Sequence, residues 1–369
     1  MRIAIDATVL DRRMTGTGRF LYNILKELPG HDSINKYFLI SGKRHDVDYN
    51  FFQSVLYNQK IIPEKLFSPV WFNYVLPGLL KKYNIDLLFA PNVLIPIVKI
   101  GKTKTIVVVH DVIFKIYKEY YPFFYRQYLS VFLPAVFKKS DMVLTVSEHS
   151  KTDIVKYYNV PPQKIDVVHN TASIKFNVDN SFDIRLDSHK LKELPEKFIL
   201  YVGVIEKRKN ITGLLKIIDI LKKRGSNIKL VLVGRPGYDF GSIKPEIEAR
   251  NDTVRYFNFL NDDEIRFIYH NAFAFVFPTF YEGFGIPPLE AMQIGLPVLT
   301  SNTSSLPEVV GNGGLMHNPD DYLGFAEDIL RLDNEEDFYL EMKSRAFKQS
   351  KKINIKDTTE KLVGIFNRF

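Results

Sequence analysis

The stretch AFVFPTFYEGFGIPPLEAM, residues 274–292, contains in order the parts of a strand, a loop and a helix. Ala274–Phe277 is a short apolar run, as expected of a strand buried in a parallel sheet. Gly283 and Gly285 mark the loop, and the prolines that follow suit a helix start, because the first helical turn tolerates proline. The spacing places Glu290 in the first turn of that helix. The stretch therefore predicts one strand–loop–helix unit of an α/β fold.

The same alternation continues in both directions from this stretch. The remaining predicted strands are residues 2–6, 38–40, 87–89, 105–109, 142–146, 198–202, 229–233 and 254–257. The predicted helices are one that follows the Thr15–Gly18 loop and contains Phe20, Ile24 and Leu28, and then residues 70–83, 123–139, 212–224 and 262–271. Because the scheme runs once in each half, we expect two doubly wound, Rossmann-like α/β domains.

The domain limits follow from where the periodicity stops. Residues 172–196 are polar and lack a sustained period, so we expect a linker there, between an N-terminal domain at 1–171 and a C-terminal domain at 197–350. We expect residues 351–369 to form a helix that packs back on the N-terminal domain. Two such domains that face each other make a cleft, and ligands of open parallel sheets bind beyond the carboxyl ends of the strands.

Composition excludes several classes of protein. The chain has 369 residues, of which 46% are hydrophobic and 25% are charged, as in a globular protein. It has no cysteine, which excludes disulfides, thiolate metal sites and a cysteine nucleophile. Asp6 interrupts the apolar N-terminus too early for a secretory signal, and no apolar stretch reaches the length of about 20 residues that a membrane span needs. We therefore expect a cytoplasmic protein.

The basic charge is confined to the first half of the chain. Residues 1–170 hold 23 Lys and Arg against 14 Asp and Glu, a net charge of +9, whereas residues 171–369 have a net charge of −1. Such asymmetry favours an anionic partner for the first half, either phospholipid, a phosphorylated substrate or nucleic acid. A solvated surface with a chance bias is an equal alternative.

The loop in residues 277–292 has the chemistry of an anion and sugar site. Gly283 and Gly285 let backbone amides approach a ligand closely, and amides at a helix start suit phosphate. Glu282 and Glu290 flank that loop, and each carboxylate can accept two hydrogen bonds from sugar hydroxyls. Either glutamate alone is more simply a surface or capping residue, but the combination favours a ligand site.

These residues resemble a known family. The pair Glu282 and Glu290, in the context YEGFGIPPLEAM, resembles the E-x7-E signature of retaining glycosyltransferases of family 4, the glycosyl transferases group 1, which have the GT-B fold. The segments GLPVLTS from Gly295, SLPEVV from Ser305 and GGL from Gly313 are also similar to this family. The resemblance is strongest over residues 198–330 and implies a GT-B arrangement of the two domains.

The resemblance implies roles for individual residues. Glu290 would bind the ribose hydroxyls of a nucleotide, and Glu282 would face the donor sugar. Arg208 and Lys209 would neutralise the diphosphate, although Val204 stands where the family usually has an arginine. His110, which follows a strand of the first domain, would contact the donor sugar. The remaining residues that the resemblance places near the nucleotide sugar are Gly16, Thr17, Gly18, Gly203, Gly283, Phe284, Gly285 and Ile286.

The implied reaction is transfer of a hexose from a nucleotide diphosphate sugar with retention at the anomeric carbon. No residue stands out as a nucleophile, so we expect a front-face substitution in which the leaving phosphate takes the acceptor's proton. No spacing resembles a metal site, and we expect neither a metal nor a cofactor. The Arg208-Lys209-Asn210 triplet looks most like that of bacterial mannosyltransferases, which favours mannose and GDP over UDP.

The expected acceptor is a glycan or a polyprenyl-linked glycan of bacterial surface polysaccharide, such as lipopolysaccharide. Residues 113–128 hold eight aromatic side chains together with Lys115, Lys118 and Arg126, a composition that suits a lipid interface. We therefore expect peripheral contact with the inner face of an anionic membrane; a core helix with a charged face is an equal alternative. A sugar-nucleotide epimerase of the same fold, an inactive nucleotide-sugar-binding protein and a nucleic-acid-binding protein are the rival functions, and the absence of a reader motif argues against nucleic acid.

Overall fold

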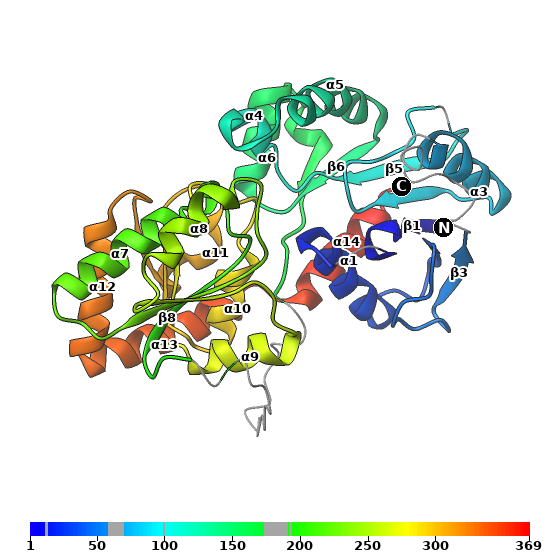
Figure 1. Ribbon diagram of the computed structural model, residues 1–369. Coiled ribbons are helices and arrows are strands. Elements are labelled where there is room, and N and C mark those ends of the chain that lie inside the picture. The colour runs from blue at the N-terminus through cyan, green and yellow to red at the C-terminus, as the bar shows by residue number, and fades with distance from the viewer. Residues whose placement is uncertain (12–13, 58–69, 99, 173–190, 192–193) are drawn as a thin grey trace. The chain divides into compact units, whose positions relative to one another are not determined.

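The structure is a computed structural model of the chain, and it describes residues 1–11, 14–57, 70–98, 100–172, 191 and 194–369. These residues form two compact units, Met1–Thr171 with Asn354–Phe369 and Ala172–Ile353 (Figure 1). Most of the expected linker at 172–196 lies outside the described residues. The last helix, α14, begins at Ile355 and belongs to the N-terminal unit.

The N-terminal unit is built on a parallel sheet. Its described strands follow the order β3-β2-β1-β4-β5-β6-β7. Their bounds are β1 Arg2–Asp6, β2 Lys36–Ser41, β3 Phe52–Leu56, β4 Leu87–Ala90, β5 Lys104–Val108, β6 Met142–Thr145 and β7 Ile165–Val167. The helices are α1 Gly16–Glu27, α3 Leu76–Lys82, α4 Ile113–Ile116, α5 Phe123–Lys139, α6 Glu148–Tyr158 and α14 Ile355–Phe366. The order reverses direction at β1, the arrangement of a doubly wound fold.

Helix α14 packs against the N-terminal unit. Figure 1 shows it beside α1, and the two helices are in contact. The ring of Phe366 meets those of Phe89 and Tyr37, with centroid distances of 5.4 and 6.3 Å. Aromatic burial of this kind contributes strongly to a core, so the C-terminal segment is an integral part of the N-terminal unit.

The C-terminal unit repeats the plan with a second parallel sheet. Its described strands follow the order β10-β9-β8-β11-β12-β13. Their bounds are β8 Phe198–Val202, β9 Lys229–Val233, β10 Val254–Phe257, β11 Ala274–Phe277, β12 Val298–Ser301 and β13 Leu315–His317. The helices are α7 Ile211–Lys223, α8 Phe240–Glu248, α9 Asp262–Asn271, α10 Ile286–Gln293, α11 Leu306–Val310, α12 Tyr322–Asn334 and α13 Glu336–Ser350. Because β8 and β11 are parallel neighbours, the loops after them share one edge of the sheet.

Most predicted elements are confirmed, and the differences have local causes. The expected loop Thr15–Gly18 is instead the start of helix α1, because the Thr15 hydroxyl caps the helix by accepting a hydrogen bond from the Gly18 amide (3.3 Å). The expected helix at 70–83 begins with a π-helical turn, Trp71–Val75, before α3. The strands β3, β7, β12 and β13 were not predicted, because they are short or partly polar.

The aromatic segment at 113–128 divides between core and surface. Ile113 and Phe114 are buried, whereas the first half of α5 exposes the large side chains of Phe123, Phe124, Tyr125, Tyr128 and Val131. Of these, Phe124, Tyr128 and Val131 share one face of the helix by their spacing, and we call these three residues the α5 stripe. Helix α5 has 17 residues, and none of the helices in the described parts of the chain has both the length and the apolar character for crossing a bilayer.

Candidate active site

The glycine loop predicted from the sequence lies at the carboxyl end of β11 and leads into α10. Gly285 adopts a backbone φ of 112°, and a Cβ there would lie 2.8 Å from the side chain of Leu306, so both conformation and space require glycine. Helix α10 then begins at Ile286, with prolines in its first turn as predicted. The amides at the start of a helix favour an anion, so this loop keeps its predicted role as a phosphate or sugar site.

Two serines fix the shape of this loop. The Ser304 hydroxyl accepts a hydrogen bond from the Glu282 amide (2.9 Å). The Ser305 hydroxyl lies 2.7 Å from the Phe284 carbonyl oxygen and 3.0 Å from that of Glu282, and it donates toward them. The loop is therefore held by side chains from the segment that precedes α11, and its geometry is set before any ligand arrives.

The Glu282 carboxylate is paired with Lys209, a residue 73 positions away in the sequence. Lys209 is almost fully buried and its ammonium lies 5.4 Å from the centre of the Phe277 ring. Burial, and next the positive charge of Arg208, lower the pKa of Lys209, while Glu282 opposes that shift. The ion pair with Glu282 therefore fixes the position of this buried ammonium group.

Arg208 occupies the adjacent position and has partners of its own. Its guanidinium donates to the Glu206 carboxylate (2.5 Å) and to the Tyr281 carbonyl (2.8 Å), and it lies 3.9 Å from Glu282. The cluster thus combines two cations with two carboxylates on one edge of the sheet. Both predicted diphosphate ligands, Arg208 and Lys209, are brought together with Glu282 here; their roles toward a nucleotide sugar stay predictions.

Glu290 lies in the second turn of α10, so our expectation of the first turn was wrong. The helix begins one position before the two prolines, which moves the carboxylate beyond the first turn. Glu290 is 3% exposed, and the Tyr269 hydroxyl lies 3.3 Å from its Oε2 atom. Glu290 is therefore not a surface residue, and its contact with the ribose of a nucleotide stays a prediction.

Gly203 lies directly after β8 and is constrained by its neighbours. A Cβ on Gly203 would lie 2.7 Å from the hydroxyl oxygen of Tyr201, and a Cβ on Gly234 would lie 1.7 Å from the carbonyl oxygen of Gly203. The two glycines therefore allow the backbone segments that follow β8 and β9 to approach each other closely. Packing alone accounts for Gly203, and its predicted contact with the nucleotide stays a prediction.

In the N-terminal unit, the structure brings His110 and Thr17 to a common pocket of about 180 Å³. His110 follows β5, and its Nε2 lies 3.0 Å from the Pro91 carbonyl, to which it donates. Burial lowers the pKa of His110, so the ring is neutral and presents Nδ1 as an acceptor. The pocket is lined by Thr17, Asn92, Val93, His110, Asp111, Ile113, Phe114, Tyr121, Tyr125, Leu129 and Leu133.

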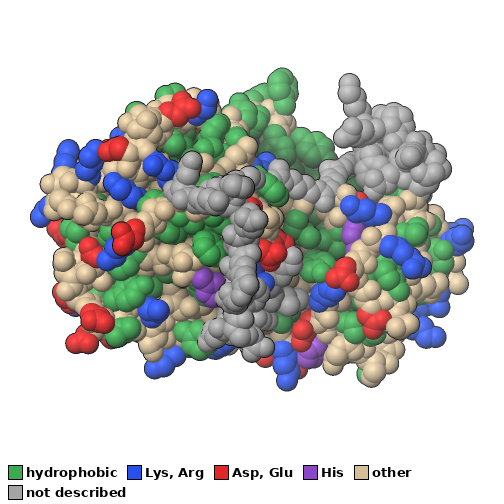
Figure 2. All heavy atoms as spheres, turned by 60° about the horizontal axis from the view of Figure 1, so that its bottom comes forward, with side chains coloured by type: hydrophobic (Ala, Val, Ile, Leu, Met, Phe, Trp, Pro, Cys, Tyr) green, Lys and Arg blue, Asp and Glu red, His purple; other side chains and the backbone are tan. Residues whose placement is uncertain are grey.

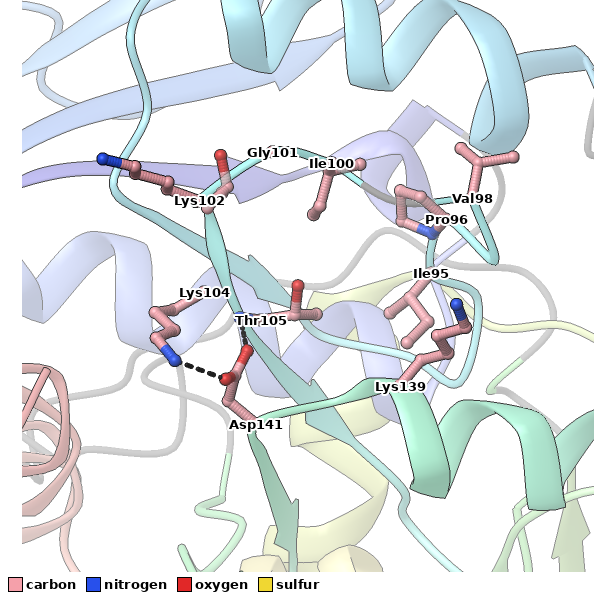
Figure 3. A pocket seen from close by; sticks show the side chains of 11 residues that line it. Ile95, Pro96, Val98, Ile100, Gly101, Lys102, Lys104, Thr105, Lys139 and Asp141 are labelled. Atoms are coloured by element: carbon pink, nitrogen blue, oxygen red, sulfur yellow. Dashed lines mark hydrogen bonds and ion pairs between the residues drawn. The ribbon is translucent and has the colours of Figure 1, made fainter.

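A larger pocket of about 510 Å³ lies at the other edge of the same sheet (Figure 3). It is lined by residues at the amino ends of β5 and β6, including Lys104, whose ammonium pairs with Asp141 at 2.9 Å. Because open parallel sheets bind their ligands at the carboxyl edge, we assign the site to the edge that carries His110.

Several contacts of the site escaped the sequence reasoning. Glu206, Ser305 and Tyr269 hold Arg208, the glycine loop and Glu290, respectively. Ser305 lies in a segment that resembles the family and Glu206 directly precedes the basic run 207–209, but no contact was predicted for either, and Tyr269 gave no signal. Among the residues that the structure describes, no three His, Asp or Glu side chains converge in the way that a metal ion needs.

Comparison with known proteins identifies the family. The model for Glycosyltransferase Family 4 matches residues 14–175, and that for Glycosyl transferases group 1 matches residues 183–349. O-antigen chain mannosyltransferase B of Escherichia coli is 28% identical over 290 residues, which cover 78% of this chain and 75% of that protein. O-antigen chain mannosyltransferase RfbU of Salmonella typhimurium is 31% identical over 329 residues, which cover 83% of this chain and 84% of that protein.

A solved structure supports the same assignment at the level of fold. HepE of Anabaena, in complex with UDP-glucose, matches with a TM-score of 0.76 at 16% identity, and 100% of each chain is covered. The two parallel sheets, the strand-end site and the family matches agree with one another. The chain therefore belongs to glycosyltransferase family 4 and is a glycosyltransferase of the GT-B fold.

Proposed function

We propose that the protein transfers mannose from GDP-mannose, with retention, to a lipid-linked glycan in bacterial surface polysaccharide synthesis. The observation that carries the proposal is the cluster of Lys209, Arg208 and Glu282 beside the start of α10. It combines cations for a diphosphate with a carboxylate for sugar hydroxyls. The names of the two O-antigen mannosyltransferases that resemble the chain support mannose as the sugar.

The cluster supports a front-face reaction without a protein nucleophile. Glu282 is already engaged by Lys209, so it is a poor candidate for attack on the anomeric carbon. In the proposed step, the C–O bond between the anomeric carbon and the diphosphate breaks while the acceptor oxygen bonds to the same face. The leaving phosphate oxygen takes the acceptor's proton, and Lys209 and Arg208 stabilise the negative charge that develops on it.

The donor is tested by ligand-induced thermal stabilisation. At about 100 times its Kd, GDP-mannose should stabilise the unit that binds it by about 2.7 kcal/mol, or about 5–11 °C in Tm. UDP-glucose at the same concentration should give a smaller shift. Larger stabilisation by UDP-sugars would overturn GDP as the carrier. Product analysis then separates transfer from epimerisation, because a sugar nucleotide converted without any acceptor would contradict the transferase proposal.

We further propose that the α5 stripe places the protein at the cytoplasmic face of the plasma membrane. Phe124 is 84% exposed and Val131 is 78% exposed, an arrangement suited to the boundary between lipid headgroups and acyl chains. Arg126 lies on the same helix, with its guanidinium 5.7 Å from the centre of the Phe123 ring. In Figure 2, cationic and anionic side chains of the coloured residues are mixed across the face that is drawn. The stripe is therefore a more specific support for the proposal than net charge alone.

Vesicle sedimentation tests the membrane proposal. The protein should bind vesicles that contain phosphatidylglycerol at low salt and leave them at high salt, because attraction between charges is screened over about 8–10 Å at ordinary ionic strength. Exchanging both Phe124 and Val131 for Asp should abolish binding, and neutralising Lys115, Lys118 and Arg126 should weaken it by about 1 kcal/mol per cation.

Ile34→Asp is the matched control for this test, since Ile34 is equally exposed, at 78%, but lies outside the stripe. It should bind vesicles like the unmodified protein, and all variants should keep their affinity for the nucleotide. If the unmodified protein ignores anionic vesicles at low salt, the basic first half serves a soluble anionic acceptor instead.

A further inference from the structure

Asn210 occupies the turn between the basic segment and α7, and its side chain uses all of its polar groups. Its amide nitrogen donates to the Pro278 carbonyl (3.0 Å) and to the Pro319 carbonyl (2.7 Å). Its amide oxygen accepts from the Gly213 backbone amide (3.1 Å), which caps α7. The residue is 4% exposed, so water does not compete for these bonds.

The backbone at Asn210 narrows the choice of residue further. Its φ of 55° and ψ of 44° lie in the left-handed region, where asparagine, aspartate and glycine are the residues best tolerated. Aspartate keeps the helix cap but cannot donate to two carbonyl groups, and glycine has no side chain. Among these three residues, asparagine alone satisfies the conformation, the cap and the two donations together.

The two carbonyl partners belong to loops that follow different strands. Pro278 follows β11 and leads to Glu282, whereas Pro319 lies beyond the end of β13. Asn210 itself ends the loop after β8, directly after Lys209. One amide therefore connects three strand-end loops of the C-terminal unit. The Arg208 carbonyl extends the connection, because it accepts from the Phe280 amide (3.1 Å) and the Thr279 hydroxyl (3.2 Å).

We infer that Asn210 is a positioning residue for the donor site. It fixes the loop of Lys209 against the loop of Glu282, so that the ammonium and the carboxylate meet without Asn210 touching the substrate. Small displacements of preorganised charges are costly to catalysis, since stabilisation of the leaving group depends on their position. The inference rests on the proposed function, in which Lys209 binds the diphosphate and Glu282 binds the sugar.

Asn210→Asp tests the inference, because it keeps the size, the backbone conformation and the helix cap while it removes both donations. We expect kcat to fall about 30-fold or more and the affinity for GDP to fall about 10-fold. Affinity for guanosine, which lacks the diphosphate, should stay within about twofold. A merely structural defect would not separate GDP from guanosine in this way.

Asn261→Asp is the matched control. Asn261 also caps a helix of the C-terminal unit, α9, by accepting from the Asp263 and Glu264 amides (3.0 and 2.9 Å), and its cap needs only an acceptor. This control should keep kcat and both affinities. Melting temperatures of all variants are recorded in parallel, and Asn210→Gly, which keeps the backbone conformation, replaces Asn210→Asp if that variant does not fold.

The outcomes separate the inference from the proposed function. If the unmodified protein neither binds GDP nor transfers mannose, the proposed function fails. If it does both and Asn210→Asp behaves like Asn261→Asp, the positioning role is overturned. Loss of folding in both Asn210 variants would also overturn it, because the residue would then hold the fold rather than the site.

Discussion

Replacing Lys209 by alanine is expected to lower kcat about 100- to 1000-fold. The substitution removes one preorganised cation from a buried site, and the loss of a single group of this kind typically has that effect. Lys209 is well placed for the role, because it is almost fully buried and its pairing with Glu282 fixes its position. Steady-state transfer from GDP-mannose, followed by release of GDP, measures the change.

Lys207→Ala is the control for this variant. Lys207 lies in the same 3₁₀ turn but is exposed, so its removal should leave kcat within about twofold, as for an ordinary surface change. The melting temperature shows whether Glu282, which then keeps only the longer contact with Arg208, destabilises the fold. Turnover that survives in Lys209→Ala would contradict the assignment of the diphosphate site.

The same assay tests independence of metal ions. Arg208→Ala should also lower turnover, whereas EDTA should leave the unmodified enzyme active, because in the proposed function the two cations would take the place of a metal at the leaving phosphate. Activity that is lost on chelation and restored by Mg²⁺ or Mn²⁺ would refute the metal-independent part of the proposal, although not the role of the cations.

Glu290→Ala has the second largest expected effect, a loss of about 100-fold or more in affinity for GDP. A carboxylate that accepts from both ribose hydroxyls would lose two hydrogen bonds, each worth about 1.5–3 kcal/mol when one partner is charged. The buried position of Glu290 beside Tyr269 supports a fixed carboxylate of this kind. Isothermal titration with GDP measures the loss.

A matched ligand makes the test specific for the ribose. The unmodified protein should bind 2′,3′-dideoxy-GDP about as weakly as Glu290→Ala binds GDP, and the variant should no longer distinguish the two nucleotides. Tyr269→Phe, which removes only the hydroxyl near Oε2, should have a much smaller effect. If Glu290→Ala folds and still prefers GDP over the dideoxy nucleotide, Glu290 does not read the ribose.

The sequence predicted the core strands well, because a strand that is buried on both faces of a sheet appears in the sequence as a continuous apolar run. Strands β1, β8, β9, β10 and β11 have the predicted bounds, as do helices α5 and α9. Continuous apolar runs and 3.6-residue periods report only on local burial, however. Strand β7, with three residues, and the partly polar edge strand β3 give little of that signal, which explains why they were missed.

The same distinction between local and long-range features applies to the candidate site. The loop glycines and the Glu282–Glu290 spacing are local features, so the motif, and with it the family, could be recognised from the sequence. The onset of α10 was misplaced relative to Glu290 because the prolines fit several positions of a first turn. The exposure of Phe123 and Phe124 on α5 was also open, since aromatic residues suit a core and an interface equally.

The sequence by itself determined the fold class, the core strands of each unit and the motif that carries the chemistry. Only the tertiary structure decided which of these residues meet. Lys209 and Glu282 are 73 positions apart and come together because β8 and β11 are parallel neighbours whose carboxyl ends share one edge. The packing of the C-terminal helix on the N-terminal unit was expected from the sequence, and the structure supplies its contacts, such as that of Phe366 with Phe89. Such contacts between distant residues depend on the order of the strands in the sheet and on hydrogen bonds between the loops that follow them. The local periodicity of a sequence contains no information about either.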